Sequence, residues 1–256
     1  MATKTQHVEA AAEQLAWKPA GDQLASERPI LTLQNGLAAE PILLRRFSKV
    51  YGGSILIPAS YTETGTVIAG AAPKVAVFVM GRMPAGSDPQ AEQIAQLLRR
   101  IDWMVQVDDH VVAWKALKLL RSVRNGLDLM RIPDADVKQH LAAAVSEEAA
   151  GALAAAGIPV ARDADRTADM SQFQVDPASG YTIGQQSTWQ SFARGAGSHE
   201  VDYLNGEIVQ LGRLHGVPTP VNTAIQTTLG RAGLQGTAPG EIPADDVIAA
   251  ARVTSA

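Results

Sequence analysis

The pattern of apolar residues changes near Asp108, and this change constrains the fold more than any other feature of the chain. Before it, short apolar runs bounded by glycine or proline alternate with helix-like segments, as at Ile30–Leu33 and Val75–Met80. After it, nearly every long segment has helical periodicity, beginning with Val111–Met130. We therefore predict an α/β domain over residues 1–107 and an all-helical domain over residues 108–256.

Local signals predict where several helices begin and end. Asp88 followed by Pro89 is typical of an N-cap and first residue, which predicts a helix to about Arg100. A second helix is expected over Pro133–Ala156, because Gly157-Ile158-Pro159 ends its pattern. A third is expected over Thr188–His215, with the N-cap at Ser187.

The α/β part begins without the strands that a parallel sheet needs before it. Ala2–Gln6 stands where a chain leaves a parallel strand, yet no strand precedes it in the sequence. The sequence holds no G-x-G-x-x-G, no P-loop and no G-x-S-x-G pattern. We therefore expect a sheet that lacks its leading strands.

Composition excludes several classes of function. The formal net charge of −4 argues against a nucleic-acid-binding surface. The absence of cysteine excludes disulfides, thiolate metal sites and cysteine nucleophiles, and the five histidines are not spaced as metal ligands, so we expect no metal site. No window approaches the roughly 20 apolar residues of a membrane span. We therefore expect a cytoplasmic protein that binds neither nucleic acid nor membranes.

The first candidate residues for chemistry lie on the predicted helix Val111–Met130. Lys118, Ser122 and Asn125 are spaced i, i+4 and i+7, so a continuous helix would place them on one face. A lysine that is partly buried there would be suited to proton transfer. Other basic residues surround it, so the spacing also fits a basic face that meets only water.

Three further positions are each open to two interpretations. Glu200 borders an apolar stripe, and it could anchor a ligand or form a surface ion pair. Ser187 could cap a helix, or its helix N-terminus could hold a carboxylate. Asn35-Gly36 could be a simple turn, or it could lie at the ligand-binding edge of an α/β sheet.

The order and spacing of these residues together resemble the ketopantoate reductase (2-dehydropantoate 2-reductase) family. The similarity rests on five short motifs. Two lie in the first part of the chain, a K-x-x-Q-like stretch at Lys4–Gln6 and a Q-N-G turn at Gln34–Gly36. The other three are a K-L-L-x-N-x-x-N-like run at Lys118–Asn125, a serine at Ser187 with the E-x-D-Y-x-N-G run at Glu200–Gly206, and the H-G ending at His215–Pro220. Ser122 stands where the family has asparagine.

The resemblance implies a truncated Rossmann-type domain that binds NADP(H), followed by a helical C-terminal domain. It implies NADPH-dependent reduction of a 2-oxoacid by hydride transfer, with ketopantoate reduced to pantoate in pantothenate biosynthesis, or reduction of a related substrate. Its implied site residues are the catalytic Lys118 and Glu200, the substrate-binding Asn125, Ser122, Ser187 and Asn35, and the cofactor-binding Lys4, Asn35 and Glu200.

The glycine-rich phosphate loop of that family is not among these 256 residues, so roughly two βαβ units are expected to be missing. An alternative function is therefore a non-catalytic helical module for dimerisation or ligand binding that has lost cofactor binding. A reductase of another branched or hydrophobic 2-oxoacid is also compatible with the motifs, and a homodimer is left open.

Overall fold

The computed structural model describes residues 1–196 and 199–254, which gather into two compact units. Each unit is assembled from three segments of the chain. The first consists of Met1–Ala59, Ala69–Lys118 and Val160–Tyr181; the second consists of Ser60–Ile68, Leu119–Pro159 and the described residues from Thr182 onward. The predicted combination of a mixed α/β N-terminal part and a helical C-terminal part is confirmed. The division into domains 1–107 and 108–256 stays a prediction.

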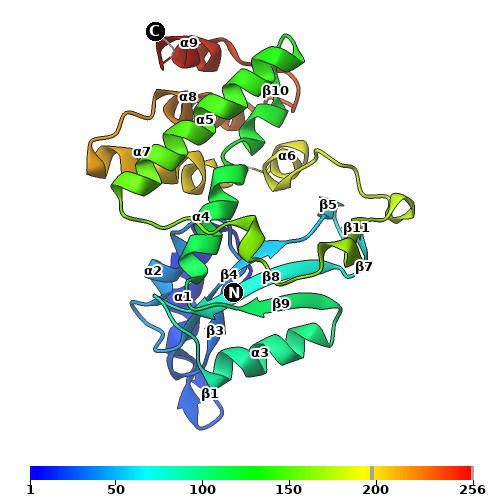
Figure 1. The fold of residues 1–256 in the computed structure, drawn as a ribbon, viewed down its shortest axis with the longest axis vertical. Helices are drawn as coiled ribbons and strands as arrows, with labels where there is room; N and C mark the ends of the chain where they lie inside the picture. The colour runs from blue at the N-terminus through cyan, green and yellow to red at the C-terminus, as the bar shows by residue number, and fades with distance from the viewer. Residues whose placement is uncertain (197–198, 255–256) are drawn as a thin grey trace. The chain divides into compact units, whose positions relative to one another are not determined.

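A four-stranded mixed sheet forms the framework of the first unit, in the order β3-β4-β8-β9 (Figure 1). Its strands are β3 (Ile30–Leu31), β4 (Val50–Leu56), β8 (Ala76–Arg82) and β9 (Trp103–Val107). β3 runs parallel to β4, β4 antiparallel to β8, and β8 parallel to β9. The two central strands are apolar on both faces and almost fully buried, which is typical of strands covered on both sides.

Helix α3 (Pro89–Arg99) packs beside β9 and covers one face of this sheet (Figure 1). It begins where the sequence predicts, because Asp88 Oδ1 accepts a hydrogen bond from the Ala91 amide at 2.9 Å. The Asp88 carboxylate also accepts bonds from the Tyr51 hydroxyl at 3.0 Å and from Arg82 Nη1 at 2.6 Å. This three-residue contact fastens the start of α3 to β4 and β8.

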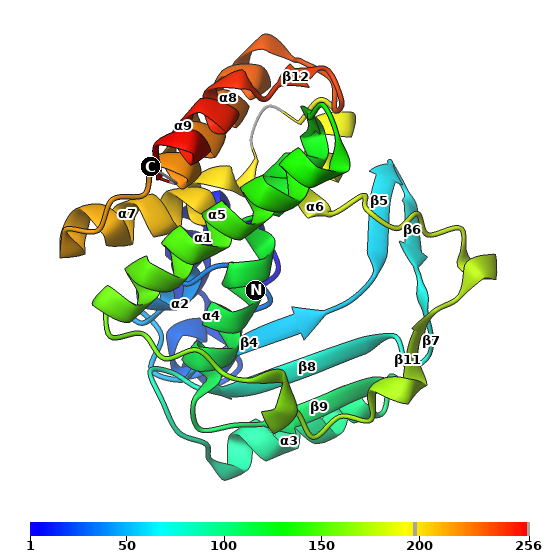
Figure 2. The same cartoon turned by 45° about the horizontal axis from the view of Figure 1, so that its top comes forward.

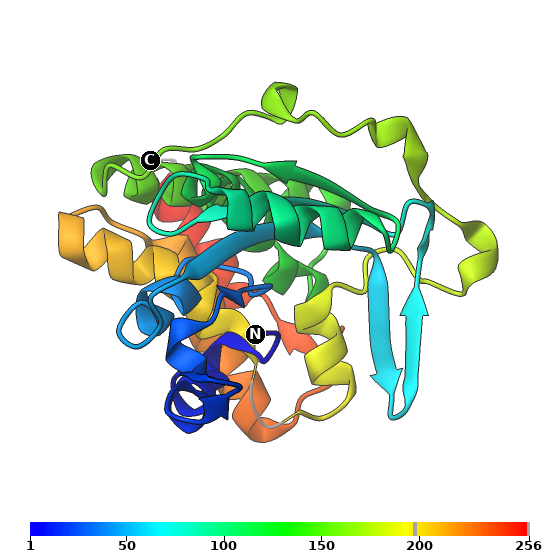
Figure 3. The same ribbon diagram turned by 90° about the horizontal axis from the view of Figure 1, so that it is seen from below.

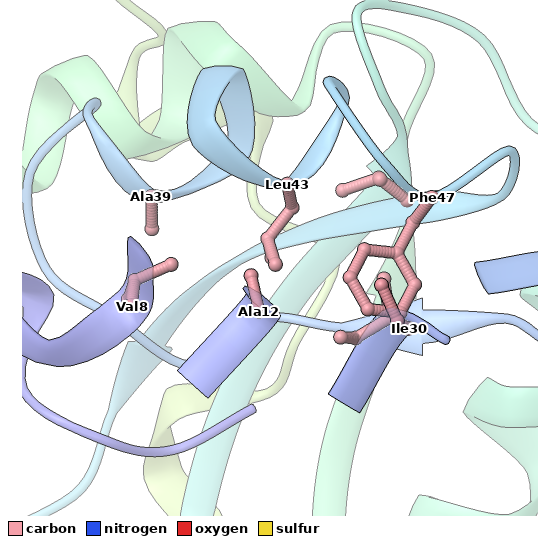
Figure 4. Close-up of a cluster of buried hydrophobic side chains, with 8 residues drawn as sticks. Val8, Ala12, Ile30, Ala39, Leu43 and Phe47 are labelled. Atoms are coloured by element: carbon pink, nitrogen blue, oxygen red, sulfur yellow. The ribbon is translucent and has the colours of Figure 1, made fainter. Parts of the chain in front are cut away.

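An apolar cluster joins α1 (Val8–Ala16) and α2 (Ala39–Leu43) to the β3 edge of the sheet (Figure 4). Small residues on α1 let the two helices approach closely, since Ala12 is fully buried against the cluster that contains Leu43 and Phe47. Ile30 brings β3 into the same cluster. The cluster therefore fixes both ends of the turn that connects β3 to α2.

The segment 160–181 returns to the first unit after α5. It runs along α4 (Val111–Ser122), where Arg166 lies 4.8 Å over the ring of Trp114, and it ends in β11 (Phe173–Val175). β11 pairs antiparallel with β7 (Ala71–Pro73), as Figure 2 shows.

The second unit is built mainly from helices. Its longer helices are α5 (Ala135–Ala155), α6 (Ser187–Ala193), α7 (Asn205–His215), α8 (Pro220–Gln235) and α9 (Asp245–Thr254). It also holds the short parallel pair β10 (Met130–Arg131) and β12 (Ile242–Pro243). The strands β5 (Ala59–Glu63) and β6 (Thr66–Ala69) form a hairpin, seen in cyan in Figure 3.

Short elements complete the chain. The hairpin strands β1 and β2 are Pro19–Ala20 and Gln23–Leu24. The 3-10 helices are η1 (Thr5–His7), η2 (Ala25–Glu27), η3 (Asn125–Leu129), η4 (Asp163–Asp165), η5 (Met170–Gln172), η6 (Pro177–Ser179) and η7 (Glu200–Tyr203). Within residues 1–196 and 199–254, no helix combines the length and the apolar character needed to cross a bilayer.

Two predicted helices are shorter than expected. The helix predicted over Val111–Met130 ends at Ser122, and Asn125 begins the separate helix η3. The helix predicted over Thr188–His215 is divided into α6, η7 and α7, and residues 197 and 198 within it lie outside the described residues. Gly195, with a left-handed φ of +61°, follows the end of α6, and the Val123 carbonyl just after the end of α4 accepts a hydrogen bond from the Asn205 side chain.

The predicted N-cap at Ser187 was also wrong. Ser187 is the first residue of α6, and the cap position belongs to Gln186, whose side chain makes no capping bond. The carbonyl of Ser187 instead accepts a hydrogen bond from the Ser191 hydroxyl at 2.9 Å.

Candidate active site

The turn Gln34-Asn35-Gly36 follows β3 after Thr32 and Leu33, in the first unit. Gly36 has a φ of +77°, a left-handed conformation that glycine adopts without strain. The preceding Gln34 is almost fully buried and fastens the turn, because its Nε2 donates to the Thr3 carbonyl at 2.8 Å. The sequence interpretation of a turn at the carboxyl end of a parallel strand is therefore confirmed by the pairing of β3 with β4.

The stretch that contains Lys4 lies against this turn. In addition to the Gln34–Thr3 bond, the Thr5 hydroxyl donates to the Asn35 carbonyl at 3.5 Å. Lys4 and Asn35 are both half-buried. Two positions separated by about thirty residues of sequence thus belong to one local surface, as expected if both serve the same ligand.

Lys118 lies on α4 and is half-buried. Its ammonium group donates to the carbonyl of Ile55 on β4. One turn earlier on the same helix, Lys115 donates to the carbonyl of Gly53, at 3.4 Å, and to the carbonyl of Gln34, at 2.9 Å. Two lysines of α4 therefore bind alternate carbonyls of the same strand.

A buried carboxylate completes this polar cluster. Glu40 Oε1 lies 2.7 Å from Lys115 Nζ, and the side chains are 0% and 2% exposed, respectively. The same oxygen accepts a hydrogen bond of 2.5 Å from the Thr32 hydroxyl. Since α2 carries Glu40 and α4 carries Lys115, the ion pair joins the two helices beneath the Gln34–Gly36 turn.

Neither Glu40 nor Lys115 was predicted to belong to the site. Lys115 is one of the basic residues near Lys118 that fitted a helix face in contact with water. The signal that was available is the i, i+4, i+8 spacing of Val111, Lys115 and Leu119, all of which are buried. A lysine within an apolar stripe indicates a buried charge, which requires a partner elsewhere in the fold.

The remaining predicted site residues belong to the second unit. Ser122 is buried at the last position of α4 and shares that helix with Lys118, whereas Asn125 begins the separate helix η3. Ser187 is exposed at the start of α6. Glu200 is half-buried as the first residue of η7.

Another part of the E-x-D-Y-x-N-G run has a structural role. Asn205 is buried, and its Nδ2 donates to the Val123 carbonyl at 2.9 Å and to Asn222 Oδ1 at 3.1 Å. Asn222 in turn donates to the carboxylate of Glu148 at 2.9 Å. The asparagine of the motif therefore helps to hold α7 and α8 against the segment after α4.

Potential metal ligands do not gather in groups of three or more among the described histidines, aspartates and glutamates. Polar chemistry in the first unit is carried by ammonium, amide and hydroxyl groups at the end of β3.

Solved structures share this class of fold, a mixed α/β part with a helical C-terminal part. A PanE/ApbA family ketopantoate reductase from Ralstonia eutropha JMP134 is similar over 91% of this chain and 74% of its own, with a TM-score of 0.68 and 22% identity. A 2-dehydropantoate 2-reductase from Geobacter metallireducens GS-15 is similar over 90% and 75%, with a TM-score of 0.68 and 20% identity. D-mandelate dehydrogenase in complex with NADH is similar over 91% and 76%, with a TM-score of 0.65 and 19% identity.

The sequence defines the family more narrowly. Residues 1–80 match the family described as "Ketopantoate reductase PanE/ApbA", and residues 111–232 match "Ketopantoate reductase PanE/ApbA C terminal". The two matches follow the order of the two parts along the chain. The chain therefore belongs to the ketopantoate reductase PanE/ApbA family, and the resemblance inferred from its motifs is confirmed.

Proposed function

We propose that this protein catalyses the NADPH-dependent reduction of a 2-oxoacid, ketopantoate to pantoate or a closely related substrate, by hydride transfer. The observation that carries the proposal is the position of Lys118. It is half-buried on α4, its ammonium group is held at β4, and its motif matches that of the family. Reduction of a ketone to an alcohol requires one hydride at carbon and one proton at oxygen.

Lys118 supplies the proton in this proposal. Its ammonium group donates a hydrogen bond to the ketone oxygen, stabilises the negative charge that develops there, and then transfers the proton. The resulting neutral amine regains a proton from water. The hydrogen bond to the Ile55 carbonyl holds the Lys118 ammonium group at β4 before substrate binds.

The donors at the end of β3 suit the nicotinamide half of a reduced dinucleotide. The Lys4 ammonium and the Asn35 amide can donate to ribose hydroxyl and phosphate oxygens, and Gly36 lets the backbone come close to a ligand. When bound there, the reduced nicotinamide supplies the hydride. D-mandelate dehydrogenase, which has a similar fold, was solved with NADH, so NADH is the natural competitor in a test of cofactor preference.

The substrate contacts are assigned from the family motifs. We assign the carboxylate and hydroxyl groups of the substrate to Asn125, Ser122 and Ser187. Glu200 is assigned to orient the reacting group and the cofactor. Ser122 has a shorter side chain than the asparagine that the family places there, so a ligand has more room beside it.

The experiment that tests this proposal is a fluorescence titration with NADPH and with NADH, followed by absorbance measurement of cofactor oxidation with ketopantoate. We expect binding of NADPH and turnover that depends on ketopantoate. Binding without turnover on ketopantoate or on other branched 2-oxoacids would contradict the proposed reaction. Absence of binding would favour the non-catalytic module.

We also propose that the protein forms a homodimer. A dimeric ketopantoate reductase from Staphylococcus aureus has a similar fold, with a TM-score of 0.62 and 16% identity. Light scattering coupled to size-exclusion chromatography distinguishes a dimer from the 27.0 kDa monomer, and a single monomeric species at micromolar concentration would contradict the proposal.

A further inference from the structure

One edge of β4 is completed by lysine side chains instead of a neighbouring strand. β3 pairs with β4 only through Ile30 and Leu31, and the last backbone bond of this ladder runs from the Thr32 amide to the Tyr51 carbonyl at 2.9 Å. Successive carbonyls on one side of a strand are two residues apart. The next two on this side belong to Gly53 and Ile55, and they accept from Lys115 and Lys118.

The three hydrogen-bonding positions of the Lys115 ammonium are all used within the protein. Its acceptors are Glu40 Oε1 at 2.7 Å, the Gln34 carbonyl at 2.9 Å and the Gly53 carbonyl at 3.4 Å. The residue is 3% exposed. Lys115 is therefore equipped to hold α2, α4, β4 and the Gln34–Gly36 turn together, and not to transfer a proton to a ligand.

Glu40 has fewer of its hydrogen-bonding positions occupied than Lys115. Its Oε1 accepts from both Lys115 and Thr32, whereas its Oε2 is buried and has no hydrogen-bond partner in the described part of the chain. A buried ion pair with an unbonded oxygen contributes less to the free energy of unfolding than apolar side chains of the same volume would. Its presence is better explained by the geometry that it fixes.

The backbone around the pair leaves little room for adjustment. A Cβ atom added to Gly52 would lie 2.8 Å from Met83 Sδ and 3.5 Å from Glu40 Cγ. One added to Gly53 would lie 2.1 Å from the Phe78 ring. Because β4 is closely packed at the level of the pair, a change in the pair is expected to move the turn and α4 and to leave the strand in place.

We infer that Glu40 and Lys115 are positioning residues, which hold the Gln34–Gly36 turn and α4 in register with β4 so that Asn35 and Lys118 face the ligands correctly. The inference rests on the proposed function for its catalytic consequence. Its structural consequence, the fixed turn, can be measured independently of activity. A misplacement of about 1 Å in a catalytic group can reduce a rate by about 100-fold.

The test compares Lys115→Met, Glu40→Gln and the double variant Glu40→Leu/Lys115→Met in the full chain. Lys138→Met is the matched control, because it removes a lysine that lies at the same 2.7 Å from a carboxylate, Asp128 Oδ1, on an exposed surface. Three quantities are measured for each protein: the unfolding midpoint, hydrogen–deuterium exchange of peptides covering residues 33–37, and the kcat and KM for 2-oxoacid reduction.

We expect the double variant to unfold at nearly the midpoint of the parent, since no unpaired buried charge remains. Exchange over residues 33–37 should nevertheless rise at least 5-fold, and kcat should fall about 10-fold or more with a smaller change in KM. Lys138→Met should match the parent in both exchange and kcat. If Lys115→Met fails to fold, the double variant and Glu40→Gln still decide the question.

The inference is overturned if exchange over residues 33–37 in the double variant stays at the level of the parent, because the pair would then serve only to fill space. It is also overturned if exchange rises equally in Lys138→Met. A parent protein without reductase activity would contradict the proposed function alone, and unchanged exchange over residues 33–37 would contradict the positioning role alone.

Discussion

The Nζ of Lys115 lies 2.7 Å from the Oε1 of Glu40, with both side chains removed from solvent. The pair connects α4 to α2, and its two residues are 75 positions apart in the sequence. Through the Gln34 carbonyl it also reaches the Q-N-G turn. One ion pair therefore connects the Q-N-G turn to the helix that carries Lys118.

Removal of one partner should destabilise the protein more than removal of both. Lys115→Met leaves an unpaired buried carboxylate, so we expect a loss of about 3–5 kcal/mol in the free energy of unfolding. Glu40→Leu/Lys115→Met should lose less than either single variant, because no buried charge is left. Urea denaturation of the two single variants and the double variant measures this coupling. Additive losses in the double variant would show that the pair does not act as a unit.

Low pH should weaken the contacts by which Asp88 attaches the start of α3 to β4 and β8. Burial acts to raise the pKa of this carboxyl, but hydrogen bonds from Arg82, the Ala91 amide and Tyr51 hold the pKa below its usual range. As the pH falls, the Asp88 carboxyl is therefore protonated at a higher pH in the unfolded chain than in the native protein. The stabilisation is present above about pH 4, the ordinary aspartate value, and is lost as the pH falls through the native pKa.

Asp88→Asn tests this dependence, since asparagine can still cap a helix but carries no charge. We expect the difference in unfolding free energy between the parent and the variant to shrink from pH 6 to pH 3 in urea titrations. A difference that stays constant over this range would mean that the charge of Asp88 contributes nothing.

Glu148 should stabilise the second unit through α8. Its carboxylate accepts from the Val221 amide at 2.8 Å, the Asn222 amide at 2.9 Å and Asn222 Nδ2 at 2.9 Å. Glu148→Ala removes a helix cap and leaves a buried amide unpaired, so we expect a loss of about 2–4 kcal/mol. The adjacent exposed Glu147 provides the control, and Glu147→Ala should change the unfolding free energy by less than about 0.5 kcal/mol. Equal losses in the two variants would contradict the capping role.

Local signals predicted much of the fold. The Asp88-Pro89 start of α3 and the strand β8, expected at Val75–Met80, were predicted from neighbouring residues, because caps, prolines and glycines act over one turn of chain. The start of α4 at Val111 was predicted correctly, but its C-terminal end was missed for the opposite reason. Its end at Ser122 depends on packing of the following segment, where Asn205 from α7 binds the Val123 carbonyl.

The only site residues that were predicted from the sequence are those that belong to the family motifs. Asn35 and Lys4 were identified together, and contacts between the Lys4 stretch and the Asn35 turn are present. Glu40 could not be identified, because a carboxylate on a short helix reads as a surface group until Lys115 is known to face it. Pairing between distant buried charges is a tertiary property that periodicity does not contain.

Lys118 is proposed as the proton donor in the reduction of a 2-oxoacid. The most direct measurement is the rate of NADPH oxidation with ketopantoate by the parent, Lys118→Ala and the control Lys49→Ala, which removes an exposed lysine. We predict that Lys118→Ala lowers kcat by about 100-fold or more while Lys49→Ala retains the parent rate. A Lys118→Ala protein that folds normally and turns over ketopantoate at the parent rate would contradict the claim.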